Sequence, residues 1–142
     1  KVCNLLQSGH VAERFEKMVS ALGGPKDFLS TYKKVLPKTE CVTPIKAKKE
    51  GFITQINTKA LGNILIKMGA GRQKASDKLN LSVGFTNVVK SNEKVNTKEA
   101  LLILHCPDKF LSPSLEEEIN NCFSISDIGP TQFKNPVLQK VV

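Results

Sequence analysis

The hydrophobic periodicity of this chain changes at Pro37, and this change constrains the fold more than any other feature of the sequence. Over residues 11–22, apolar side chains recur at three- and four-residue spacing, which is typical of an amphipathic helix. Residues 27–35 repeat the pattern and predict a shorter helix that ends before Pro37. Beyond that proline come short segments rich in β-branched residues, separated by turn residues. We therefore expect two regions, residues 1–38 and residues 39–142.

The second region alternates predicted strands with two predicted helices. The strands are expected over residues 41–47, 51–56, 83–89, 100–105 and 132–142. One helix is expected to begin at the cap Asn57-Thr58 and to end at Gly69, and another to span residues 115–123 after a cap at Ser112 or Ser114. The fold class predicted for the whole chain is α+β.

The pattern of residues over 51–53 and 93–104 is weakly similar to that of biotinyl and lipoyl carrier domains, although no Met-Lys-Met hairpin occurs. We therefore expect a mostly antiparallel, barrel-sandwich-like β domain with one crossing helix and one outer helix.

The chain is basic, with 21 Lys and Arg against 13 Asp and Glu and a formal charge of +8, which favours an anionic partner. The lysines are scattered, however, and Arg14 and Arg72 are the only arginines. Basic charge without a recognition motif or a stripe of stacking aromatic residues is usually a solvated surface. We therefore expect no nucleic-acid partner.

The four cysteines, Cys3, Cys41, Cys106 and Cys122, stand too far apart for a zinc knuckle or a C-x-x-C motif. Without a signal peptide or disulfide-dense spacing, reduced thiols in a cytoplasmic protein are expected. The longest apolar runs are too short to cross a bilayer, so we expect no membrane partner. The chain opens with Lys1 and runs directly into an apolar stretch, which indicates a cut end.

The segment 69–77 is the sharpest candidate site, and its candidate residues are Gly69, Gly71, Arg72, Lys74 and Ser76. Its glycines allow backbone N–H groups to approach an anion, and the two cationic side chains can complete a phosphate cradle. It follows a helix instead of preceding one, which is the wrong polarity for binding by a helix dipole. On the residues alone, a helix C-cap with an exposed surface loop is the alternative interpretation.

No catalytic or metal-binding constellation is predicted. His10 is expected to be solvated, and His105 to be a partly buried packing residue at the end of a strand. Because neighbouring strand residues point to opposite faces, His105 and Cys106 are not expected to form a base and nucleophile pair. The acidic run 116–118 is expected to be the solvated start of a helix.

Several stretches of the chain resemble thymidine phosphorylases of the pyrimidine nucleoside phosphorylase family. Leu6-Gln7-Ser8-Gly9 through Gly24-Pro25-Lys26-Asp27-Phe28 looks like the last helices of their phosphate-binding α/β domain. Gly71-Arg72-Gln73-Lys74-Ala75-Ser76-Asp77 and Ser82-Val83-Gly84-Phe85-Thr86 are similar to elements of their C-terminal domain and are specific to the thymidine branch. The resemblance covers nearly the whole chain and identifies it with the C-terminal portion of such an enzyme.

The resemblance implies reversible phosphorolysis of thymidine to thymine and 2-deoxyribose 1-phosphate, with inorganic phosphate as co-substrate and no organic cofactor. The family's phosphate and pyrimidine clusters, and the helical domain through which its members form homodimers, lie upstream of the matched region. No catalytic residue can therefore be placed in this chain, which alone is expected to be inactive. Residues 69–77 correspond to a family loop implicated in closing the cleft. The alternative is a stand-alone interaction module derived from such a domain.

Overall fold

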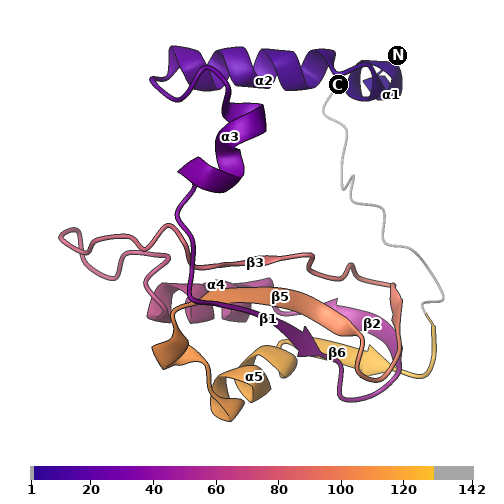
Figure 1. Cartoon of the computed structure of the whole chain (residues 1–142). Coiled ribbons are helices and arrows are strands. Elements are labelled where there is room, and N and C mark those ends of the chain that lie inside the picture. The colour runs from indigo at the N-terminus through magenta and orange to yellow at the C-terminus, as the bar shows by residue number, and fades with distance from the viewer. Residues whose placement is uncertain (1, 130–142) are drawn as a thin grey trace, which may run out of the picture. The chain divides into compact units, whose positions relative to one another are not determined.

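The computed structural model describes residues 2–129 and divides the chain into two compact units, Lys1–Pro37 and Lys38–Val142 (Figure 1). The described part of unit 1 contains the helices α1 (Val2–Gln7), α2 (His10–Ala21) and α3 (Phe28–Val35). Helices α2 and α3 confirm the two helices predicted from the amphipathic stripes, and α1 was not predicted.

Glycines set the ends of the longest helix of unit 1. Gly9, with φ +83°, separates α1 from α2. At the other end Gly23 has φ +90°, its N–H donates to the Ser20 carbonyl at 3.1 Å, and the Gly24 N–H donates to the Val19 carbonyl at 2.9 Å. This is the Schellman arrangement, which satisfies the last carbonyls of a helix.

Unit 1 has little interior. Phe28 packs edge-on against Phe15 with ring centroids 5.9 Å apart, and the Leu29 N–H donates to Glu16 Oε1 at 3.1 Å. These contacts join α2 to α3, yet no side chain in residues 2–37 is buried.

Unit 2 contains two three-stranded antiparallel sheets. In the first, the order is β1 (Cys41–Lys46), β5 (Ala100–Cys106) and β3 (Gly84–Thr86). In the second, the order is β4 (Lys94–Val95), β2 (Gly51–Ile56) and β6 (Phe123–Ser126). The α+β class is confirmed, and the described strands form two separate sheets that do not close into a barrel.

The helices of unit 2 begin at the predicted caps. Asn57 Oδ1 accepts the Ala60 N–H at 3.0 Å at the start of α4 (Thr58–Lys67). Ser112 Oγ accepts the Leu115 N–H at 3.2 Å at the start of α5 (Pro113–Asn120), so Ser112 and not Ser114 is the cap. A short 3₁₀ helix, η1 (Asp108–Phe110), lies between β5 and α5.

Two predicted elements are shorter than expected. Helix α5 ends at Asn120 instead of residue 123, because Phe123 pairs with Ile56 as the first residue of β6 and is 7% exposed. The strand expected over residues 83–89 is reduced to β3, because Asn87, with φ +50°, ends the extended run. The strand predicted over residues 132–142 lies outside the described residues.

The core of unit 2 gathers around β5, the central strand of the first sheet. Leu101, Leu102 and Leu104 on this strand are completely buried. The other buried members of the core are Ile45, Ala47, Ile53, Leu61, Ile64, Met68, Val95, Cys106, Ile119, Cys122 and Phe123. Burial of this apolar area is the main source of stability for unit 2.

Candidate functional site

The predicted loop begins at the C-terminal end of α4, which is packed into the core of unit 2. Met68, 3% exposed, belongs to the core of unit 2, and Gly69 follows it with φ +94°. The Gly69 N–H donates to the Ile66 carbonyl at 3.0 Å, and the Ala70 N–H donates to the Leu65 carbonyl at 2.9 Å. This is a second Schellman motif, so the loop starts as a helix C-cap.

Two further contacts fix the base of the loop. A Cβ atom at Gly71 would lie 2.5 Å from Ile66 Cγ1, so only glycine lets the chain pass this close to α4. The Asn80 N–H donates to the Gly69 carbonyl at 2.8 Å and brings the two ends of the loop together. The base is therefore held by backbone hydrogen bonds and close packing.

The tip of the loop is closed by Asp77, a residue that the sequence interpretation placed in the loop without a role. Its Oδ2 accepts the N–H of Gln73 at 3.0 Å and that of Lys74 at 2.8 Å, and its own N–H donates to the Lys74 carbonyl at 3.0 Å. The signal available in the sequence was the turn-forming run Lys-Ala-Ser-Asp, in which a carboxylate can bond to backbone two to four residues away.

This arrangement changes how the loop can hold an anion. Because Asp77 occupies the amides of Gln73 and Lys74, those N–H groups are not a vacant phosphate cradle. The side chains of Arg72, Lys74 and Ser76 are instead exposed to solvent. An anion that meets the loop in this conformation therefore meets side chains first, and Arg72 offers the planar fork best suited to phosphate.

The surroundings of the loop combine positive charge with exposed apolar side chains. Lys78 follows the turn, and Leu79 and Leu81 are 41% and 76% exposed. The cationic groups attract anions over several ångströms. The apolar side chains add surface that another part of a protein can cover.

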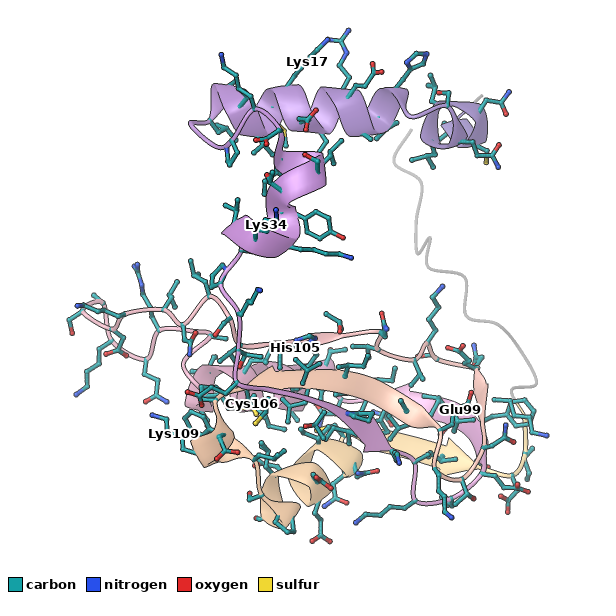
Figure 2. All side chains as sticks on the ribbon, in the orientation of Figure 1. Lys17, Lys34, Glu99, His105, Cys106 and Lys109 are labelled. Carbon is teal, nitrogen blue, oxygen red and sulfur yellow. The ribbon has the colours of Figure 1, made fainter. Side chains whose placement is uncertain are left out.

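The histidines are not brought into the loop. His105 Nε2 lies 2.8 Å from Thr86 Oγ1 on the neighbouring strand, and among the described residues no carboxylate bonds to its other ring nitrogen. Cys106 is completely buried and points to the opposite face of β5, at whose end both residues are labelled in Figure 2. Burial raises the pKa of the Cys106 thiol, so this sulfur is a poor nucleophile near neutral pH.

Outside the loop, the described residues contain a surface ion pair at His10 and no cluster suited to a metal ion. His10 Nδ1 lies 3.7 Å from Glu13 Oε2 on an exposed surface of α2. Within residues 2–129, no three histidine, cysteine or carboxylate side chains converge as they would around a metal ion. None of the helices described here combines the length and the apolar character needed to cross a membrane.

The described residues thus define an α+β fold with a hydrogen-bonded basic loop, and they include no hydroxyl–imidazole–carboxylate set. The sequence model for the pyrimidine nucleoside phosphorylase C-terminal domain matches residues 52–126, more than half of the chain. The chain belongs to this family. The match lies within unit 2, runs from β2 to β6 and includes the loop, which places the domain among enzymes of nucleoside metabolism.

Proposed function

We propose that this chain is the C-terminal part of a thymidine phosphorylase and helps to close its cleft over thymidine and inorganic phosphate. In this reaction a phosphate oxygen attacks the anomeric carbon, the bond from that carbon to the pyrimidine nitrogen breaks, and thymine leaves 2-deoxyribose 1-phosphate behind. Phosphate is the co-substrate and no organic cofactor takes part. The complete enzyme is a cytoplasmic homodimer whose catalytic residues lie upstream of the matched region.

The loop geometry carries this proposal. A closing element needs a firm base and an exposed tip of the correct charge, and residues 69–80 have both. The base is fixed by the Schellman motif and by Asn80, while Arg72 and Lys74 stand exposed beyond it. When such a tip covers a phosphate dianion, it excludes water and adds positive charge where negative charge is held.

The choice of thymidine rests on residues instead of on the domain family alone. Gly71-Arg72 with Ala75-Ser76-Asp77, and the run Ser82–Thr86, are similar to elements of the thymidine branch. Deoxyuridine and uridine are therefore the comparison substrates, and thymidine is expected to give the highest kcat/KM.

The first experiment measures phosphate-dependent release of thymine by ultraviolet absorbance, with the intact mass taken on the same sample. Thymine release from a protein larger than this chain supports the proposal. Release from the bare chain of 142 residues would place the chemistry within it and contradict the assignment of catalysis to upstream residues.

The second experiment tests the loop in the complete enzyme. Arg72→Ala removes the group best suited to phosphate, and a charge-assisted hydrogen bond is worth roughly 1.5–3 kcal/mol, so kcat/KM for phosphate should fall by roughly 10- to 100-fold. Arg14→Ala removes the same side chain from the exposed surface of α2 and should leave kcat/KM unchanged. Equal values for both variants would remove the loop from the mechanism.

A specific observation favours the alternative of an interaction module. The described part of unit 1 exposes many apolar side chains, from Tyr32 at 40% to Leu22 at 81%. A surface of this kind suits a protein partner. The alternative gains support if purified chain of the bare mass releases no thymine and sediments with a second protein.

A further inference from the structure

Two cysteines that are far apart in the sequence lie opposite each other on neighbouring strands of the first sheet of unit 2. Cys41, the first residue of β1, and Cys106, the last residue of β5, are direct partners in the antiparallel register. Opposite residues in such a pair have Cα atoms about 4.5 or 5.5 Å apart and side chains on the same face. Disulfides need Cα atoms about 4.4–6.8 Å apart, so both types of pair satisfy this requirement.

Burial shows which face the two thiols share. Cys106 is completely buried in the core of unit 2, and Cys41 is partly buried against the same core. Both are free thiols in the structure. The backbone therefore already holds the two sulfur-bearing carbons on one side of the sheet. Bond formation requires side-chain rotation and a small approach of the two strands, because Cβ atoms of opposite residues are about 4.5–5.5 Å apart and those of a disulfide about 3.5–4.5 Å.

The other two cysteines lack this relation. Cys3 lies on α1 in unit 1, and Cys122 is buried after α5, where its thiol donates to the Glu118 carbonyl at 3.3 Å. Neither is a register partner of another cysteine in the described strands.

We infer that Cys41 and Cys106 form a reversible disulfide when unit 2 meets a low-molecular-weight disulfide such as oxidised glutathione. The partly exposed Cys41 thiolate attacks one glutathione sulfur, the glutathione disulfide bond breaks, and one glutathione thiolate leaves. The Cys106 thiolate then attacks Cys41 Sγ and displaces the second glutathione. Two protein thiols are oxidised, one glutathione disulfide is reduced to two thiols, and two protons leave the protein.

The charges around the pair control the rate of this exchange. Burial and then the hydrogen bond from the Cys41 thiol to Asp108 Oδ1, at 3.4 Å, raise the pKa of Cys41, and the charges of Asp108 and Glu40 add to the shift. Burial and the charge of Asp108 likewise raise the pKa of Cys106. Since only thiolates react, exchange is slow near neutral pH and quickens about tenfold per pH unit while the attacking thiol stays mostly protonated.

The disulfide would hinder the opening of strand β1. Strand β1 is at the edge of its sheet and is held by β5 alone. Its first residue follows the junction of the two units at Pro37 by four positions, so a disulfide at Cys41 fastens the strand where unit 2 begins. Opening of the strand from this end is then blocked by a covalent link to the central strand.

The test treats the whole chain with oxidised glutathione at several pH values and maps the cysteine peptides by mass. The expected product lacks two hydrogen atoms, links the peptides of Cys41 and Cys106, and returns to the thiol form with dithiothreitol. Amide exchange in β1 should slow several-fold in the oxidised form. A product with glutathione retained on Cys41, or a link to Cys3 or Cys122, would overturn the inference.

Single substitutions test which cysteines form the link and how Asp108 affects its rate. Cys3→Ser should leave the link intact, whereas Cys41→Ser should abolish it. Asp108→Asn removes the negative charge beside Cys41 and leaves a neutral amide oxygen as the acceptor, so the link should form several-fold faster at the same pH. An unchanged or slower rate for Asp108→Asn in a folded protein would contradict the proposed control by charge.

Discussion

The two units differ in what their apolar residues accomplish. In unit 2 the side chains of Leu101, Leu102 and Leu104 are completely shielded from water, whereas in unit 1 Leu22 is 81% exposed and no described side chain is buried. Both regions carry regular hydrophobic patterns. The comparison shows that a pattern specifies a secondary-structure element, whereas a core also requires opposing surfaces within the same unit.

The difference has an energetic consequence. Helix α2 has 12 residues and α3 has 8, and isolated helices of this length are marginal in water. Unit 1 therefore has few buried contacts to stabilise its helices, while unit 2 contains its own core.

Leucine truncation should separate the units most clearly. Leu104→Ala leaves a cavity at a fully buried position, and it should lower the free energy of unfolding by about 2–5 kcal/mol. Leu22→Ala removes a side chain that is mostly in water and should change it by less than about 0.5 kcal/mol. Urea denaturation followed by circular dichroism measures both, and equal losses would show that unit 2 does not hold the more stable core.

Glycine replacement tests how tightly the backbone of unit 2 is packed. A Cβ atom at Gly51, where φ is +141°, would lie 2.6 Å from the Ser126 carbonyl oxygen, so Gly51→Ala should destabilise by roughly 1–3 kcal/mol. Gly62 lies within α4, with nothing within 4 Å of the added atom. Gly62→Ala should therefore stabilise by roughly 0.5–1 kcal/mol, and thermal unfolding of both variants gives the sign.

Ion pairs on the surface of unit 2 should contribute least to its free energy of unfolding. Lys67 Nζ lies 2.6 Å from Glu118 Oε1 and links α4 to α5, but both side chains are well exposed. A double-mutant cycle with alanine should give a coupling free energy of roughly 0.2–1 kcal/mol that weakens in salt. The Lys48–Glu117 pair, 3.8 Å apart, is the matched control and should couple less. A coupling as large as the effect of Leu104→Ala would mean that the core does not dominate.

Local signals predicted the elements that depend on local chemistry. The amphipathic stripes gave α2 and α3, and the Asn57 cap and Gly69 stop gave the limits of α4 within a residue or two. The α+β class followed from the same change of periodicity at Pro37.

Features that depend on distant partners were missed. Strand β6 has four residues and was not predicted, although the predicted helix reached its first residue, because its pairing with β2 involves residues about 70 positions away. Strand β4 has two residues, too few for any period to show. The facing positions of Cys41 and Cys106 follow from strand register, which the sequence alone did not specify.

In the candidate loop, one feature was predicted from the sequence and another was missed. Its glycine cap at Gly69 was evident from the end of the preceding helix. The role of Asp77 was not evident, because an aspartate in a polar loop can bond to its own backbone or face solvent, and the choice depends on the turn that forms.

The hydrogen bonds of Asp77 have one more consequence, for the entropy of binding. A loop that orders only when its ligand arrives loses conformational freedom at that moment, at about 1–2 kcal/mol for each residue fixed, and affinity falls accordingly. In residues 73–77 the turn is already formed by the protein's own carboxylate. This part of the ordering therefore takes place during folding, so the loop proposed to close over phosphate does not have to order it on binding.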